Sequence, residues 1–225
     1  MHIDTQPSIL YFGTPVVLIS TKNENNTDNL APMSSAFWLG WRCVIGLAAA
    51  SKTTQNLLRT RQCVLNLPSV NEAVAVNRLA KTTGTNPVPE GKALKGYHYE
   101  ESKFEIAGLH KQSSATVSAV RVAECPVQME AVVEAVHGIA EGDPLVQGKI
   151  LTFELRIQKV HLEECILMAD NANRVDPDKW RPLIMSFQQF YGLGEKVHYS
   201  TLGEIPEQLY NTADRERAMP VMGVL

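Results

Sequence analysis

Short apolar runs rich in β-branched residues recur along the first third of the chain. Three such runs are residues 15–21 (PVVLIST), 44–50 (VIGLAAA) and 63–67 (CVLNL), and polar residues or glycine flank them. Apolar runs of this length, bounded by turn-forming residues, are typical of buried strands. The first third of the chain therefore predicts three strands of one core.

Two other segments have the pattern of short helices. Residues 53–61 predict a helix with Leu57 and Leu58 facing the core and its arginines facing solvent. Residues 71–79 predict a second helix, and Asn71 is a suitable N-cap because its side chain can accept from the first free N–H groups.

The clearest strand signal is a pair of alternating segments in the second half of the chain. In residues 126–138 (PVQMEAVVEAVHG) and 149–160 (KILTFELRIQKV), apolar side chains alternate with polar ones. The turn-rich residues 138–148 (GIAEGDPLVQG) join the two segments. This pattern predicts a long antiparallel hairpin with one face in the core and one face in water.

The order of elements is mostly strands with two or three short helices, and no internal repeat is present. This order favours a β-barrel with helical inserts over an alternating βαβ sheet. Residues 81–96 contain three glycines and two prolines and predict a long loop, a kind of segment that tends to be functional or mobile.

Composition narrows the class of protein. The 225 residues are 44% hydrophobic and 20% charged, as in ordinary globular proteins with one sizeable core. A net charge of −3 and the absence of a Lys/Arg run argue against a nucleic-acid binder. The N-terminus lacks the pattern of a secretory signal, and residues 44–50, the longest apolar run, are too short to span a bilayer. We expect a cytoplasmic protein.

The cysteines and histidines predict no metal site. The four cysteines lie in or beside apolar segments without a C-x-x-C pair, which predicts buried free thiols; they are Cys43, Cys63, Cys125 and Cys165. The six histidines are scattered, and no H-x-x-x-H pair is present.

Residues 51–56 (SKTTQN) follow a predicted strand and open a predicted helix. The free N–H groups of a helix N-terminus attract anions, and the hydroxyls and Lys52 can add donors and charge for a phosphate. An ordinary N-cap explains the hydroxyls as well. Lys52 favours the phosphate interpretation, because a cation opposes the helix dipole at this end.

Residues 29–38 (NLAPMSSAFW) predict a loop with two interpretations. Pro32 biases Ala31 toward an extended backbone, which would leave the N–H groups of residues 33–35 available to a flat polar ligand. Alternatively, the aromatic residues enter the core. Taken together with residues 51–56, the segment fits a phosphorylated planar cofactor better than a metal ion or a nucleic acid.

These segments, in their order, resemble the flavin reductase-like proteins of the FMN-binding split-barrel superfamily. The resemblance spans about residues 9–205 and rests on NLAPMSSAFW, SKTTQNLLRTRQCVLNL, ESKFEIAGL, CPVQMEA, VDPDKWRPL and HYSTLGE. It implies one domain over residues 1–225 with a tail at 206–225. The implied fold is a Greek-key split β-barrel, mainly β with short helices. Such proteins are usually homodimers with FMN near the subunit interface.

The resemblance also implies which residues hold FMN. Backbone groups of one segment would line the isoalloxazine ring, and these residues are Asn29, Ala31, Pro32, Met33, Ser34, Ser35 and Ala36. A second set would hold the phosphate, with Asn56 assisting: Ser51, Lys52, Thr53 and Thr54. The preceding AAAS lacks an arginine that many relatives carry there.

The implied activity is hydride transfer from NADH or NADPH to flavin, with a monooxygenase as a partner that receives reduced flavin. Because the flavin carries this chemistry, we expect no catalytic side chain. His198 and Tyr199 are secondary candidates for lining the flavin or the nicotinamide. Two other functions stay open: reduction of a small substrate or disulfide by bound FMN, and flavin binding without catalysis.

Overall fold

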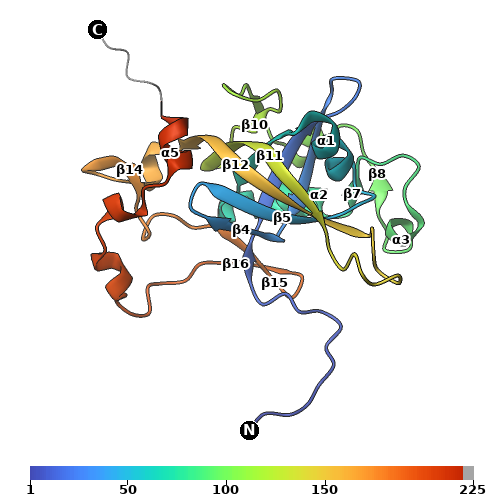
Figure 1. Cartoon of the computed structure of the whole chain (residues 1–225), viewed down its shortest axis with the longest axis horizontal. Coiled ribbons are helices and arrows are strands. Elements are labelled where there is room, and N and C mark those ends of the chain that lie inside the picture. The colour runs from blue at the N-terminus through green and yellow to red at the C-terminus, as the bar shows by residue number, and fades with distance from the viewer. Residues whose placement is uncertain (220–225) are drawn as a thin grey trace.

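The computed structural model describes residues 1–219, and its centre is a seven-stranded antiparallel sheet (Figure 1). The strand order is β3-β2-β6-β11-β12-β5-β4. The bounds of these strands are β2 Val17–Lys22, β3 Asp28–Met33, β4 Ala36–Leu39, β5 Arg42–Ala48, β6 Gln62–Leu67, β11 Val127–Gly138 and β12 Ile150–Leu162. The three predicted early strands and the long hairpin are confirmed, with shifts of a few residues at their ends.

The two outermost strands of this sheet, β3 and β4, are consecutive in the sequence and are joined by Ser34 and Ser35 alone. β3 pairs with β2, and β4 pairs with β5. The sheet therefore curls until its two ends meet in one continuous segment. The predicted loop over residues 29–38 is wrong, because Pro32 lies in β3, an outer strand where its missing N–H costs no central ladder bond.

The remaining elements are short. The helices are α1 Lys52–Thr60, α2 Ala73–Leu79, α3 Glu90–Ala93, α4 Lys103–Ala107 and α5 Ala213–Ala218, with 3₁₀ turns η1 Val70–Glu72, η2 Glu164–Ile166, η3 Thr201–Glu204 and η4 Glu207–Tyr210. A small sheet contains β1 Thr14–Pro15, β15 Leu183–Ser186 and β16 Gln189–Gly192. Three strand pairs complete the fold: β7 Thr82–Thr83 with β8 His98–Tyr99, β9 Lys111–Gln112 with β10 Arg121–Val122, and β13 Leu167–Met168 with β14 Asn171–Val175.

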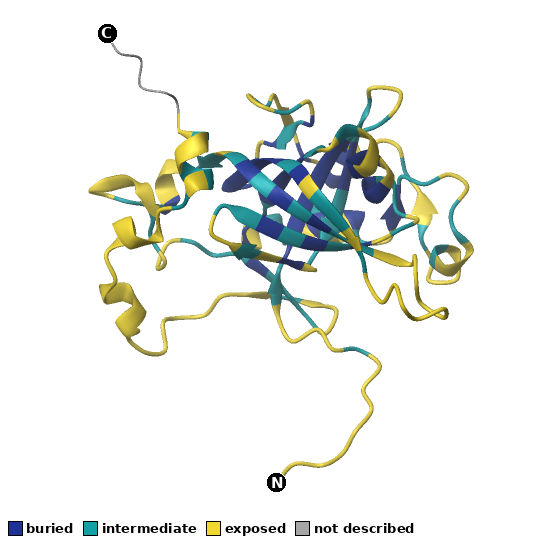
Figure 2. Ribbon diagram, viewed as in Figure 1, coloured by how far each residue is buried: buried dark blue, intermediate teal, exposed yellow. Residues whose placement is uncertain are grey.

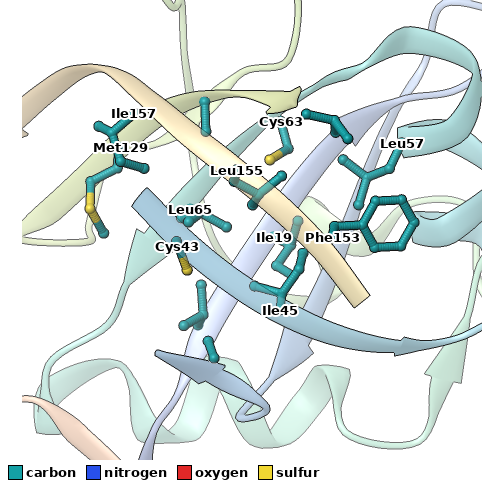
Figure 3. Close-up of a cluster of buried hydrophobic side chains, with 14 of the residues drawn as sticks. Ile19, Cys43, Ile45, Leu57, Cys63, Leu65, Met129, Phe153, Leu155 and Ile157 are labelled. Carbon is teal, nitrogen blue, oxygen red and sulfur yellow. The ribbon is translucent and has the colours of Figure 1, made fainter. Parts of the chain in front are cut away.

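Two apolar clusters hold these layers together. The first fills the barrel and includes Ile19, Ile45, Leu65, Phe153 and Leu155 (Figure 3). The second lies between the outer face of β2 and β3 and the helices α2 and α4, and includes Leu18, Leu30, Val76, Leu79 and Phe104. Figure 2 shows this buried centre and the exposed N-terminal and C-terminal segments. Each fully buried side chain of this kind contributes about 1.5–3 kcal/mol.

Two details of the predicted helices are wrong. Leu57 is buried, but Leu58 is 48% exposed, because a single helical face contacts the barrel and the next residue points about 100° away. Ser69, rather than Asn71, caps the second helical segment. The Ser69 hydroxyl accepts from the N–H of Asn71, and the Glu72 carboxylate accepts from the N–H of Ser69, which forms a capping box.

The predicted water-exposed face of the hairpin is also wrong for the first half of β11. Gln128 and Glu130 are buried, at 6% and 0% exposed. Residues 113–125 cover this face: Gln128 donates to the carbonyls of Val122 and Cys125, and Glu130 accepts from residues 115 and 116. A folded-back loop thus supplies the hydrogen bonds that water was expected to supply.

Three of the four cysteines are buried free thiols, as predicted, and burial raises the pKa of Cys43 to about 12. The fourth, Cys165, is exposed, which contradicts the prediction. Cys165 lies in η2, where Ile166 is the residue that points into the core.

Residues 81–96, predicted as a loop, contain β7 and α3 and pack beside α1 at the right of Figure 1. The C-terminal segment with β14 and α5 lies at the opposite end of the molecule. The last part of the expected tail, residues 220–225, lies outside the described residues.

Candidate functional site

The start of α1 offers unpaired backbone donors. The Ser51 hydroxyl caps the helix by accepting from the N–H of Thr54 at 3.1 Å. The N–H groups of Lys52 and Thr53, in the first turn, have no intrahelical acceptor. These two N–H groups and the helix dipole make this end of α1 attractive to an anion.

The three hydroxyls at this helix end are not equivalent. Ser51 Oγ donates to Thr54 Oγ1 at 2.9 Å, and Thr54 Oγ1 donates to the Ala48 carbonyl at 2.9 Å. Thr53 Oγ1 accepts from Asn29 Nδ2 at 3.2 Å, so its own proton is left over. Of the three hydroxyls, Thr53 is therefore the one whose proton has no acceptor among the described residues, although its side chain is buried.

Lys52 forms an ion pair on the surface. Its Nζ lies 2.7 Å from Oε2 of Glu24, in the turn after β2, and this hydrogen bond lowers the pKa of the Glu24 carboxyl. The Glu24 side chain is 55% exposed. Exposed pairs of this kind are weak, so an incoming anion can replace Glu24 at Lys52 at small cost.

A buried polar cluster links α1 to the barrel. Asn29 Nδ2 donates to Thr21 Oγ1 at 3.3 Å as well as to Thr53, and Asn56 Nδ2 donates to Thr21 Oγ1 at 3.0 Å and to Asn23 Oδ1 at 2.8 Å. Asn29 and Asn56 are at most 3% exposed. The structure thus brings Asn29, Thr53 and Asn56 together, although they come from β3 and two turns of α1.

Lys103 belongs to the same cluster, and the sequence pattern did not single it out. Lys103 is 3% exposed, and its Nζ donates to Asn29 Oδ1 at 3.1 Å. Burial, with repulsion from Lys92, lowers the pKa of the Lys103 amine to about 8. A signal was present: Lys103 opens the segment KFEIA, whose buried residues Phe104 and Ala107 mark an inward face.

The proposed ring-binding residues lie further along the segment that contains Asn29. Pro32 and Met33 are in β3, Ser34 and Ser35 form the junction, and Ala36 begins β4. Five residues of extended chain from Asn29 to Ser34 span about 17 Å at about 3.3 Å per residue. An elongated ligand is required to contact both this junction and α1.

A cavity of about 260 Å³ lies beside the start of α1 and is lined by Asn29, Lys52, residues of the turn 23–27, and residues 84, 86 and 99–101. Gly84 is required here, because a Cβ at this position would lie 2.7 Å from Asn29 Oδ1 and 3.1 Å from Lys52 Cγ. The lining also contains the carboxylates of Glu24, Glu100 and Glu101.

Comparisons with known proteins identify the family. Residues 9–193 match the family described as "Flavin reductase like domain". The chain belongs to the flavin reductase-like family. The fold is the split barrel of these reductases, as the resemblance implied.

A curated relative of this chain is the uncharacterised protein YdfE of Bacillus subtilis strain 168. It is 36% identical over 194 residues, which cover 86% of this chain and 90% of YdfE. Flavoredoxin of Desulfovibrio vulgaris (Miyazaki F) has the same fold, with a TM-score of 0.71, 20% identity, and coverage of 91% of this chain and 100% of flavoredoxin. Nitrilotriacetate monooxygenase component B from Bacillus cereus gives a TM-score of 0.67 and 18% identity over 85% of this chain and 89% of that one.

The residues of this family member fit a flavin nucleotide. The backbone N–H groups of Lys52 and Thr53 at the start of α1 are the donors that would hold its phosphate. The outer strands β3 and β4 each have one side outside the sheet ladder, where a planar polar ring can hydrogen-bond.

Other chemistry has less support in the structure. Across residues 1–219, no cluster of three or more His, Cys, Asp or Glu side chains could hold a metal ion. None of the helices in that range is long and apolar enough to cross a membrane. His198 and Tyr199 lie exposed in the C-terminal segment, where the Tyr199 hydroxyl donates to Glu204 at 2.8 Å.

Proposed function

We propose that this protein binds FMN and catalyses the reduction of flavin by NADH or NADPH. The observation that carries the proposal is the helix N-terminus at Lys52 and Thr53, one strand away from the β3–β4 junction in a flavin reductase-like fold. The acidic lining of the neighbouring cavity supports FMN, which has one phosphate, over a dinucleotide flavin.

The residues divide into two binding roles. At the phosphate end, the N–H groups of α1 and the Lys52 amine neutralise the dianion, and Ser51, Thr54 and Asn56 hold the helix start in place. At the ring end, the small side chains of Ser34, Ser35 and Ala36 let the backbone of residues 31–36 approach a planar ring. When bound, FMN supplies the hydride acceptor at N5.

The protein would therefore raise the rate of hydride transfer by positioning the flavin and the nicotinamide. A rigid outer strand that holds one ring leaves its other face open to a nicotinamide, and alignment of two reactants accounts for a large part of enzymatic acceleration. We also propose that the protein is a cytoplasmic homodimer that supplies reduced flavin to a monooxygenase. One protein of the same fold, the Bacillus cereus protein, is component B of a monooxygenase, which supports this acceptor.

The first experiment is an FMN titration of the purified protein, followed by visible absorbance and flavin fluorescence. Protein that is colourless and binds no added FMN would refute the proposal. The second is anaerobic stopped-flow mixing of the FMN-loaded protein with NADH and, separately, NADPH. Rapid loss of flavin absorbance with one nucleotide supports a reductase. Tight FMN binding without bleaching by either nucleotide would instead assign a flavin-binding protein without this activity.

A further inference from the structure

A cavity of about 580 Å³ lies between the β4–β5 turn, β12 and the C-terminal segment. Figure 1 shows β14 and α5, which contribute to its wall, at the left of the molecule, apart from α1. No residue of the described chain lines both this cavity and the one beside α1. The wall is mainly apolar and includes two tryptophans: Trp38, Trp41, Met129, Ile157, Leu162 and Val175.

The charged side chains in this wall are both positive. Lys159 and Arg215 line the cavity, whereas no Asp or Glu among residues 1–219 does so. Neither cation forms an ion pair within 4.0 Å in that part of the chain. Lys159 is exposed and Arg215 is half-buried. An apolar cavity with two uncompensated cations complements a ligand that has an apolar body and a negative charge.

The helix α5 holds Arg215 at this cavity. The preceding residue, Asp214, accepts from Arg42 Nε at 2.8 Å and so fastens α5 to the barrel. The Arg215 guanidinium donates to the side chain of Asn211, one helical turn earlier, and its other N–H groups have no acceptor among residues 1–219. A guanidinium held in this way can bind a carboxylate through two parallel N–H bonds.

A second cavity, of about 690 Å³, adjoins the first. The two share four wall residues: Trp41, Asn173, Val175 and Arg215. The second wall is rich in side-chain amides, and the one carboxylate that the described chain places in it, Glu207, is paired with Arg174 at 2.9 Å. Arg215 thus lies where an apolar cavity meets a polar one, which suits the charged end of an amphipathic ligand.

We propose that these two cavities form a binding site for an aryl carboxylate, with the ring against Trp38 and Trp41 and the carboxylate at Arg215. Indole rings favour stacked or edge-on contacts with another aromatic ring, which selects an aryl body over an alkyl chain. The inference goes beyond the proposed function. Neither cavity includes the proposed flavin-binding residues, so an aryl carboxylate and FMN can be bound together.

The test is isothermal titration calorimetry of the full-length protein with 1-naphthoate, without FMN and with excess FMN. Two other ligands separate ring from charge: 1-naphthalenemethanol has the ring without the charge, and octanoate has the charge without the ring. The variants are Arg215→Gln and Trp41→Leu, and their melting temperatures show whether they fold. Arg217→Gln is the matched control, because Arg217 is an exposed residue of α5 that lines neither cavity.

We expect 1-naphthoate to bind equally well with and without FMN. Arg215→Gln should weaken it about 10- to 100-fold, because a charge-assisted hydrogen bond is lost, and 1-naphthalenemethanol should bind the wild type more weakly by a similar factor. Trp41→Leu should weaken 1-naphthoate about 2- to 10-fold, and Trp41→Phe should restore most of this loss. Octanoate should bind more weakly than 1-naphthoate, and Arg217→Gln should bind like the wild type.

Four results would overturn the inference: no binding of 1-naphthoate at millimolar concentration, equal binding of 1-naphthalenemethanol, tighter binding of octanoate, or an unchanged affinity in a folded Arg215→Gln. Competition with FMN would also overturn it, by assigning 1-naphthoate to the flavin site. An affinity that falls as the protein concentration rises would assign the cavities to a second copy of the chain instead. A protein that binds 1-naphthoate but no FMN would refute the proposed function alone.

Discussion

Replacement of Glu130 by glutamine tests how strongly the loop over residues 113–118 is fastened to the barrel. The Glu130 side chain is 0% exposed. Its Oε1 accepts from the N–H of Ala115 at 2.8 Å and contacts His161 Nε2 at 2.7 Å, and its Oε2 accepts from the N–H and the hydroxyl of Thr116, both at 2.5 Å. Glutamine has the same shape, but its NH₂ group would face at least one of these donors.

The size of the expected loss in the free energy of unfolding follows from the pKa of Glu130. Burial alone would raise this pKa, but hydrogen bonds from Thr116, Ala115 and His161 outweigh burial and lower it from 4.5 to about 2. At about 1.4 kcal/mol per pH unit, the charged form is stabilised by about 3 kcal/mol in the folded protein. We expect Glu130→Gln to reduce the free energy of unfolding by this amount at pH 7 and to lower the melting temperature by about 6–12 °C.

Urea unfolding of the wild type and Glu130→Gln between pH 7 and pH 2 is the assay. The pKa is lower in the folded state than in the unfolded state, so the contribution of the carboxylate is complete above pH 4.5. It is lost as the pH falls from 4.5 toward 2. The two unfolding curves should therefore converge across this interval.

Glu134→Gln is the matched control on the same strand. Glu134 pairs with Arg156 at 2.7 Å and its side chain is 37% exposed, so its loss should change stability by less than about 1 kcal/mol. A Glu130→Gln variant within about 0.5 kcal/mol of the wild type would refute the reasoning. A difference that stays constant from pH 7 to pH 2 would refute it equally.

Three further predictions concern single residues. Lys52→Ala should weaken FMN about tenfold in a fluorescence titration and leave riboflavin unchanged, and equal losses would remove Lys52 from the phosphate subsite. Gly84→Ala places a Cβ 2.7 Å from Asn29 Oδ1, so it should destabilise the protein by about 1–3 kcal/mol in urea unfolding and weaken FMN binding. Wild-type affinity and stability would show that the segment around residue 84 moves freely. Cys165 should be the one fast-reacting thiol of the described native chain toward a thiol-specific chromogenic reagent, with all four reacting in denaturant, and rapid reaction of a second thiol would contradict the burial of the other three.

The sequence predicts the barrel well where hydrophobic periodicity is undisturbed. β5, β6 and the β11–β12 hairpin have apolar runs or strict alternation, because tertiary packing and local pattern agree there. The pattern fails in β3 and β4, because Pro32 and the two serines at the junction resemble a loop, whereas the residues on either side of Ser34 and Ser35 lie in outer strands. It also fails at Glu130, which was expected to face water. The alternation of apolar and polar residues in a strand does not reveal that a distant loop covers the polar face.

Part of the candidate site can likewise be predicted from the sequence, and part cannot. A helix start rich in hydroxyl side chains can be recognised from its residues, and residues 51–56 do open α1. Which hydroxyl keeps a free proton depends on the direction of each hydrogen bond, and no spacing rule contains that information. Lys103 reaches Asn29 across 74 residues, a contact that only the packing of α4 against β3 creates.

The two-residue junction of β3 and β4 also determines how the protein tolerates a break in its chain. In the intact protein, the ends of the central sheet are tied covalently through Ser34 and Ser35. Hydrolysis of the Ser34–Ser35 bond would untie them, so that β3 and β4, whose outer edges already lie outside the ladder, could move apart and pair with other chains. Proteolytic nicking at this bond would thus let the curled sheet open, whereas a nick in the exposed turn at residues 140–148 would leave the ends of the sheet tied.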